Sequence, residues 1–145
     1  MGHLQVSPPP PDAELMQIWV LNSQTELRGL RLALQQALAA YTSTVSEPLA
    51  DIPDRMVLVA TELATNAIKY GRPPTEVRLL RTHDQFVIEV ADRDLSTMPE
   101  LVDTRPVNAG GRGLLLAQSF SLTVGWYATA TTKNVWATFP MTPES

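Results

Sequence analysis

Three polar residues recur along one predicted helix at a spacing that places them on the same side. Glu62, Asn66 and Lys69 stand at positions i, i+4 and i+7, which face one way on a helix of about 3.6 residues per turn. A carboxylate, an amide and an ammonium group would therefore line the rim of the buried helix face. From spacing alone, a solvated helix edge with an ordinary Glu–Asn contact is the simpler interpretation.

A second candidate is the run Gly110-Gly111-Arg112-Gly113, which precedes a predicted short helix. Glycines let a backbone approach a ligand closely, and free N–H groups at a helix N-terminus suit phosphate oxygens. The run matches neither a Walker A loop nor a complete G-x-G-x-x-G after a strand. The alternative interpretation is that these glycines belong to an ordinary loop before a helix.

A third candidate is Asp92, which follows an apolar strand. Its carboxylate could accept a hydrogen bond from an exocyclic amine such as that of adenine. Asp94 supplies a second carboxylate, but no other carboxylate is placed to support acid–base or metal chemistry by the pair. The alternative is that Asp92 simply ends the strand, as aspartates commonly do.

The elements that must position these residues begin with a strand and a helix. Residues 15–21 read as a strand. Ser23 or Thr25 can cap the helix that follows, and Glu26 stands where a capping box requires it. Leucines and alanines then recur at helical spacing to about Tyr41.

A second helix and a hairpin follow. The helix begins near Pro53 and ends at Tyr70, with Gly71 as its C-cap. Residues 75–81 and 85–91 are two strands on either side of a short turn, which predicts an antiparallel hairpin. We expect alternate residues of the second strand to line one face.

The remaining elements determine the fold class. No periodicity is found over residues 92–111, and a loop of this length in a compact domain indicates function or a wrong assignment. A short helix from Leu114 to about residue 120 and strands at 122–127 and 134–139 complete the order β-α-α-β-β-loop-α-β-β. Strands and helices do not alternate, so we predict an α+β two-layer sandwich with a mostly antiparallel sheet and helices on one face.

Composition limits the classes of function. The 145 residues are 44% hydrophobic and 18% charged, and this length and composition suit one domain. We predict the domain at residues 13–141, after a flexible proline-rich tail at 1–12 and before a short tail at 142–145. The formal charge of −4 argues against broad binding to nucleic acid or an anionic membrane. We expect a cytoplasmic protein, because no secretory signal and no apolar run of about 20 residues is found.

Cysteine and histidine usage excludes further chemistry. The chain has no cysteine, which excludes disulfides, thiolate catalysis and cysteine-ligated metal sites. Its two histidines, His3 and His83, are too few for a histidine-rich metal site. A Ser-His-Asp triad would need His83 as its base.

Taken in order, the candidate motifs resemble those of the GHKL ATPases. The segment from Glu62 to Gly71 resembles their N box, Asp92 their adenine-binding aspartate, and the sequence Gly111-Arg112-Gly113-Leu114 their second glycine box. Lys133-x-Val135-Trp136-Ala137 is similar to the closing strand of one branch, the stand-alone anti-sigma-factor serine kinases. The resemblance covers roughly residues 15–140.

The resemblance implies a Bergerat ATP-binding fold with ATP between the helices and a lid formed by residues 93–111. It implies that Asn66 holds Mg²⁺ through its amide oxygen and that Glu62 is the general base for the attacking hydroxyl. Lys69 would reach a phosphate. Arg112 and the N–H groups of Gly111, Gly113 and Leu114 would neutralise the phosphate tail.

The sequence departs from the family pattern at two places. The first glycine box usually reads D-x-G-x-G, whereas here Asp94 and Ser96 replace both glycines. Thr132 stands where a glycine usually precedes Lys133. These departures concern nucleotide affinity more than the fold.

Three functions compete. The first is a serine/threonine protein kinase that uses Mg-ATP to phosphorylate an anti-anti-sigma (STAS-type) partner and sequesters a sigma factor. The second is a partner-switch binding module with weak or no nucleotide binding, which the missing glycines favour. The third, a detached catalytic domain acting on histidine, would need a separate phospho-accepting partner. The resemblance also implies that a homodimer is plausible.

Overall fold

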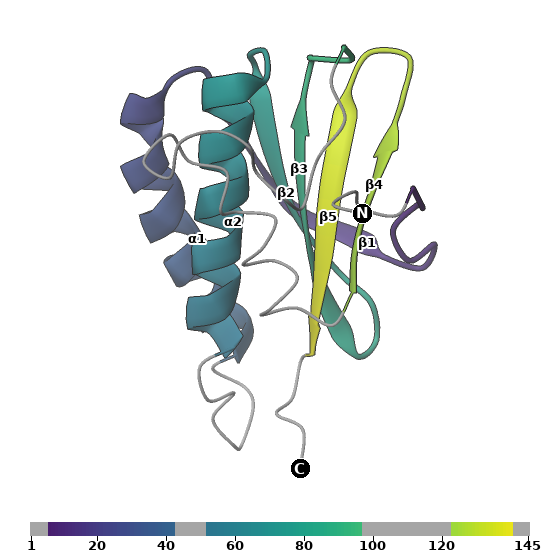
Figure 1. The fold of residues 1–145 in the computed structure, drawn as a ribbon. Coiled ribbons are helices and arrows are strands. Elements are labelled where there is room, and N and C mark those ends of the chain that lie inside the picture. Colours follow the sequence, from purple (N-terminus) through teal and green to yellow (C-terminus); the bar gives the residue numbers. More distant parts are fainter. Residues whose placement is uncertain (1–5, 43–51, 97–122, 141–145) are drawn as a thin grey trace.

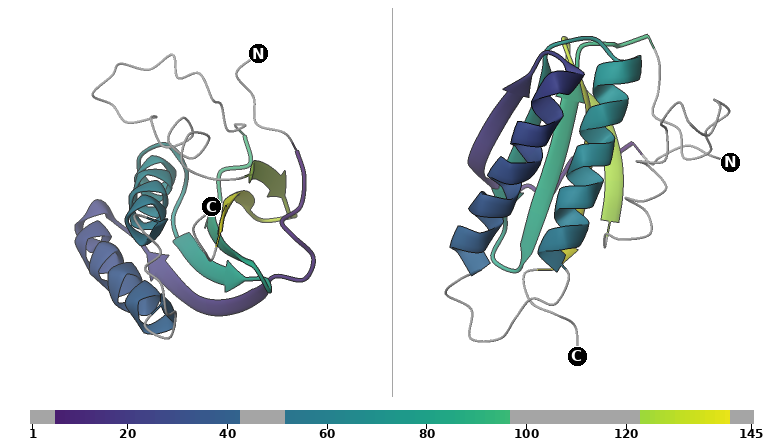
Figure 2. Two further views of the ribbon diagram at one scale, coloured as in Figure 1. Left: turned by 90° about the horizontal axis from the view of Figure 1, so that it is seen from below. Right: turned by 90° about the vertical axis from the view of Figure 1, so that its left-hand side faces the viewer.

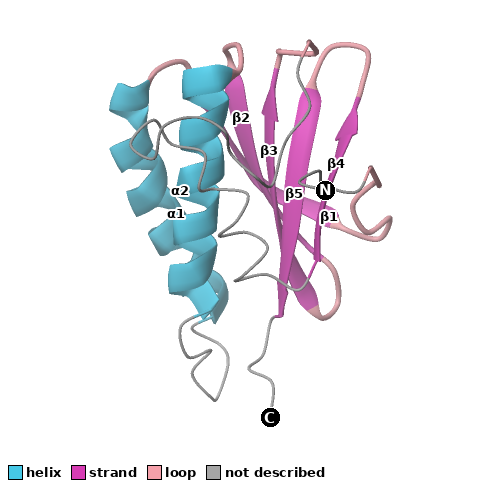
Figure 3. Cartoon of the chain, in the orientation of Figure 1, coloured by secondary structure: helices cyan, strands magenta, loops and turns pink. Residues whose placement is uncertain are grey.

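The computed structural model describes residues 6–42, 52–96 and 123–140. One sheet carries two long helices on one face (Figures 1 and 3). The described elements are, in chain order, β1 (Glu14–Leu21), the 3-10 turn η1 (Gln24–Glu26), α1 (Leu27–Thr42), α2 (Ile52–Tyr70), β2 (Thr75–Arg81), β3 (Gln85–Asp92), β4 (Thr123–Ala128) and β5 (Lys133–Pro140). The predicted α+β sandwich is confirmed. The expected short helix near residues 114–120 lies outside the described residues.

The sheet has the order β1-β2-β3-β5-β4, and every neighbouring pair of strands is antiparallel. The predicted hairpin of β2 and β3 is confirmed, with Val77 opposite Val90 and Leu79 opposite Ile88. Strand β5 enters the sheet beside β3, and β4 takes the edge beyond it. The end of β3 and the start of β5 are thereby brought together.

The core lies between the helices and one face of the sheet. Viewed from the helix side, α1 and α2 lie next to each other in front of the sheet (Figure 2, right). Alternate residues of β3 point toward them, as predicted. The buried core includes Leu30, Leu34 and Leu38 of α1, Met56, Val59, Ala60, Leu63 and Ala67 of α2, and Val77, Leu79, Phe86, Ile88, Val90, Ala137 and Phe139 of the sheet. Neither described helix has the length and hydropathy needed to cross a membrane.

The start of the first helix differs from the predicted capping box. The Ser23 side chain makes no capping hydrogen bond, and its hydroxyl lies 2.7 Å from the hydroxyl of Thr25. The carboxylate of Glu26 instead accepts the N–H of Asn22 at 2.9 Å. The chain forms one 3-10 turn before α1 begins, so Glu26 reaches one residue further back than the motif requires.

The N-terminal segment extends the sheet beyond its edge strand β4 and contacts the face opposite the helices. Val6 forms a parallel bridge with Trp126, and the N–H of Ser7 donates to the Trp126 carbonyl at 2.9 Å. The indole N–H of Trp136 donates to the Ser7 carbonyl at 2.9 Å. The part of the proline-rich segment that the structure describes is thus attached to β4 and β5, whereas residues 1–5 lie outside the description.

A buried carboxylate joins several strands on this far face. Glu89 accepts hydrogen bonds from the Tyr127 hydroxyl and, at 3.0 Å, from the Asn134 amide. Arg78 lies 3.8 Å from the other carboxylate oxygen. Burial and the adjacent carboxylate raise the pKa of Tyr127 above its ordinary value, so this phenol remains a donor at neutral pH.

Candidate functional site

Helix α2 carries the polar edge that the sequence predicts. Glu62 and Asn66 are half-buried and Lys69 is exposed, whereas the intervening Leu63 and Ala67 are buried in the core. The helix packs on β2, β3 and β5, so this edge borders the helix–sheet interface. Glu62 and Asn66 therefore lie at the rim of the core, where side chains can reach both protein and solvent.

The end of α2 lies directly against Asp92. The N–H of Gly71 donates to the Ala67 carbonyl at 2.9 Å. A Cβ atom at Gly71 would lie 2.5 Å from Asp92 Cγ, 2.7 Å from Asp92 Oδ1 and 2.6 Å from the Ala67 carbonyl oxygen. The φ angle of Gly71 is not left-handed. Gly71 is therefore required by close packing, and not by the left-handed backbone of the predicted C-cap.

Asp92 is a buried carboxylate with several donors around it. Its side chain is 6% exposed, and the ammonium of Lys133 lies 3.8 Å from Oδ2. The Asp94 N–H donates to Oδ1 at 2.7 Å, and the backbone N–H of Arg72 also donates to the carboxylate. Burial raises the pKa of Asp92, and the two N–H groups and Lys133 only partly offset it.

Lys133 also lies at the candidate site. The sequence indicated it only as the first residue of a strand that resembles the closing strand of the anti-sigma-factor kinases. The register of β3 and β5 places it directly opposite Asp92, and its side chain is only 11% exposed. The signal in the sequence was the position of a lysine at the start of a strand. Its pairing with Asp92 follows from a contact between distant segments, which the local pattern does not contain.

The segment after Asp92 is held by side chains at the positions of the missing glycines. Asp92 accepts the N–H of Asp94, and Asp94 in turn accepts the N–H of Ser96 at 2.9 Å and its hydroxyl at 2.5 Å. Such Asx bonds from residue i to residue i+2 form turns without glycine. Asp94 is thus engaged in the turn that follows the strand.

The predicted phosphate-binding group lies outside the described residues. Gly111, Arg112, Gly113 and Leu114 all fall within residues 97–122, and so does most of the expected lid. The structure therefore brings Asp92 to the end of α2, and it leaves the predicted roles of Glu62, Asn66, Lys69 and these four residues as predictions.

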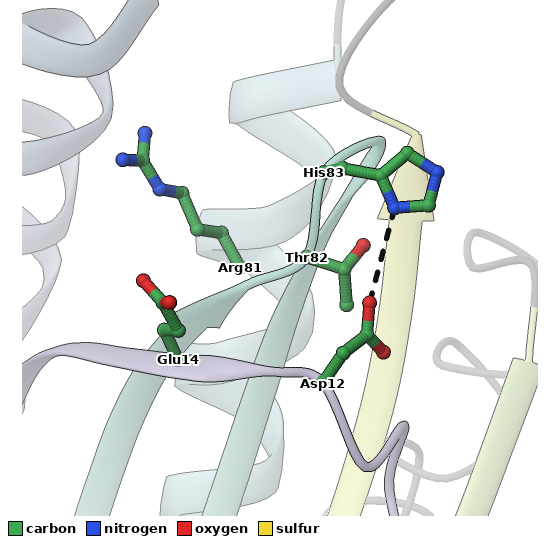
Figure 4. A pocket seen from close by; sticks show the side chains of 5 residues that line it. All are labelled: Asp12, Glu14, Arg81, Thr82 and His83. Atoms are coloured by element: carbon green, nitrogen blue, oxygen red, sulfur yellow. Dashed lines mark ion pairs between the residues drawn. The ribbon is translucent and has the colours of Figure 1, made fainter.

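A surface hollow lies at the opposite end of β3 from Asp92. Figure 4 shows its lining, formed by Asp12, Glu14, Arg81, Thr82 and His83. The imidazole Nδ1 of His83 is 3.8 Å from the Asp12 carboxylate, and the side chain of His83 is 84% exposed. His83 is therefore remote from Asp92 and lies in a solvated turn, where it cannot serve that site as a base.

Comparison with known families decides the identity of the fold. A family model described as the histidine kinase-like ATPase domain matches residues 20–139. The chain belongs to this family. The match confirms the resemblance to the GHKL ATPases as a superfamily, and ATP binding is the function that the family supports. No curated protein gives a match.

The described residues fit a nucleotide of this family. Asp92 offers a carboxylate acceptor beside Gly71 and Lys133, and a carboxylate can accept a hydrogen bond from an exocyclic amine. Among the described residues, no group of three or more His, Asp or Glu side chains is arranged so that it could hold a metal ion by itself. Mg²⁺ bound mainly by phosphates and water, with one or two protein oxygens, would suit such a site.

We predict that Gly71→Ala destabilises the protein by about 1–3 kcal/mol, because the added methyl group overlaps the Asp92 carboxylate and a helix carbonyl. Chemical denaturation measures this change. Gly29→Ala is the matched control, since a Cβ there meets no atom within 4 Å and alanine is favoured in a helix by about 0.5–1 kcal/mol. Equal effects of the two substitutions would contradict the packing argument.

We predict that Asp92→Asn changes the pH dependence of stability. The pKa of Asp92 in the folded state is raised above its ordinary value of 3.8, so the folded protein favours the protonated form. The stability of wild type relative to the variant should therefore fall as pH rises from about 4 through the raised pKa. Urea denaturation at several pH values tests this, and a pH-independent difference would contradict it.

Proposed function

We propose that this domain is an ATP-dependent serine/threonine protein kinase that acts on an anti-anti-sigma (STAS-type) protein and binds a sigma factor. ATP binding follows from the family. The identity of the acceptor and of the sigma factor rests on the resemblance of residues 62–71 and 133–137 to the stand-alone anti-sigma-factor kinases. The proposal thus goes further than the family match.

The observation that carries the proposal is that one helix, α2, carries Glu62 and Asn66 along one edge and ends beside Asp92. Helix α2 ends at Tyr70, and Gly71, which follows it, lies against Asp92, the proposed acceptor for the base. Asn66 and Glu62 stand five and nine residues earlier on the same helix, roughly 7 and 14 Å away along the axis. A nucleotide that binds its base at Asp92 and extends along α2 would place its phosphates near these side chains.

The roles of the two residues follow from their chemistry. The amide oxygen of Asn66 is a hard ligand suited to Mg²⁺. The carboxylate of Glu62 would accept the proton of a serine or threonine hydroxyl as its oxygen attacks the γ-phosphorus, and ADP would leave. Lys69, one turn beyond Asn66, would neutralise phosphate charge. Mg-ATP supplies the phosphoryl group and the charge compensation for its transfer.

A second candidate function is a non-catalytic partner-switch module. The observation that favours it is the turn formed by Asp92, Asp94 and Ser96, whose side-chain hydrogen bonds replace two glycines of the family pattern. A segment fixed in this way has less freedom to rearrange around a nucleotide than a glycine-rich one. Such a module would bind its protein partner without phosphoryl transfer.

We predict that Asn66→Ala weakens the binding of Mg-ATP at least tenfold while binding of ATP without Mg²⁺ changes little, because the substitution removes a metal ligand. Titration calorimetry with and without Mg²⁺ measures both affinities, and nucleotide fluorescence checks for athermal binding. Gln17→Ala on the exposed strand β1 is the control for loss of an amide elsewhere. Absence of ATP binding by folded wild type would refute the kinase proposal.

We predict that Glu62→Gln lowers phosphoryl transfer to a purified STAS-type protein by roughly 10²–10⁴-fold, the usual contribution of a general base, with ATP affinity close to wild type. Transfer of the labelled γ-phosphate measures the rate. Glu14→Gln, at the end of the sheet remote from Asp92, is the control variant. Transfer by Glu62→Gln at the wild-type rate would contradict the role of Glu62 as the base.

A further inference from the structure

A row of three residues crosses the sheet beneath the end of α2. Asp92 of β3 pairs with Lys133 of β5. The β2–β3 register pairs Val77 with Val90 and Glu76 with Ala91, and its continuation by one residue places Thr75 opposite Asp92. Thr75 lies on the helix face, because Val77 and Leu79 of the same strand alternate with it and are part of the core.

The hydroxyl of Thr75 is buried and has no hydrogen-bond partner. The residue is 0% exposed, and Oγ1 is one of two buried side-chain polar atoms without a partner in the part of the chain that the structure describes. A buried hydroxyl that makes no hydrogen bond costs free energy, and most are satisfied in native proteins. Thr75 thus places a buried hydroxyl without a hydrogen-bond partner next to Asp92, the proposed acceptor for the base.

The second such atom provides an internal comparison. Thr138 Oγ1 is likewise buried without a partner, but it belongs to the opposite face of β5, since its neighbours Ala137 and Phe139 point into the core. Thr138 pairs with Val87 and Thr123, several residues along the strand from Lys133. Of these two hydroxyls among the described residues, the one beside Asp92 is that of Thr75.

We propose that Thr75 is a further nucleotide-binding residue, whose hydroxyl hydrogen-bonds the base held at Asp92, directly or through one water molecule that the base encloses. This inference rests on the proposed ATP site. A threonine hydroxyl can donate and accept, so it complements a carboxylate that only accepts and an ammonium that only donates. The three groups together would read both a donor and an acceptor on the edge of a purine.

The test compares Thr75→Val with Thr138→Val. Valine keeps the shape and removes the hydroxyl, so both variants should be as stable as wild type or more stable. Calorimetry with Mg-ATP should show a loss of affinity of roughly fivefold for Thr75→Val, about the value of one neutral hydrogen bond, and no change for Thr138→Val. Thr75→Ser, which retains the hydroxyl, should bind ATP as wild type does.

A second ligand separates a role at the base from a general loosening of the site. Mg-inosine triphosphate has the same ribose and phosphates as ATP but a different donor and acceptor pattern on its base. The ratio of the two affinities should change in Thr75→Val and stay constant in Thr138→Val and Thr75→Ser. If valine prevents folding, Thr75→Ala compared with Thr75→Ser makes the same measurement.

The outcomes distinguish this inference from the proposed function. If wild type binds no Mg-ATP, the kinase proposal and the role of Thr75 both fail. If wild type binds Mg-ATP and Thr75→Val binds it equally well with the same preference over inosine triphosphate, only the role of Thr75 is refuted. A loss of affinity in Thr75→Val alone supports it.

Discussion

The candidate site depends on how closely the end of α2 approaches the end of β3. The approach is so tight that a single Cβ atom at position 71 would overlap the Asp92 carboxylate. Because the helix is fixed to the sheet by a close-packed core, this distance cannot relax without moving the core itself. The packing that stabilises the fold therefore also determines where a buried carboxylate stands, and a glycine is the only residue that the arrangement accepts.

A carboxylate in that place is unfavourable for stability and suited to recognition. Burial raises the pKa of Asp92, while the N–H groups of Arg72 and Asp94 and the ammonium of Lys133 partly compensate for the lost hydration. A well-satisfied structural aspartate would usually show a lowered pKa. The net effect here has the opposite sign, because burial outweighs the groups that favour the charged carboxylate.

Local pattern was sufficient for most of the fold. The apolar spacing of α2 predicted its end at Tyr70 correctly, and the short turn between two strands predicted the pairing of β2 with β3. The same spacing placed Glu62 and Asn66 on the rim of the core. Periodicity succeeds in these cases because each element buries one face, so that sequence period and packing direction are linked.

Contacts between distant segments were beyond that reasoning. The pairing of Lys133 with Asp92, the hydrogen bond from the Trp136 indole to Ser7, and the buried Glu89 cluster each join strands that are far apart in the sequence. Their residue types are ordinary for exposed strands. Only the strand order, with β5 inserted between β3 and β4, makes them neighbours, and a single sequence does not encode that order in any local period.

The departure from the glycine pattern has a physical reading that the sequence alone did not provide. Glycines after such an aspartate permit the chain to turn away from the strand, and their absence suggested a weakened site. In this chain Asp94 and Ser96 make the turn through successive side-chain hydrogen bonds. The path of the chain after Asp92 is therefore determined by side-chain hydrogen bonds, and not by the conformational freedom of glycine. The missing glycines thus change how the turn is made while the carboxylate remains at the end of α2.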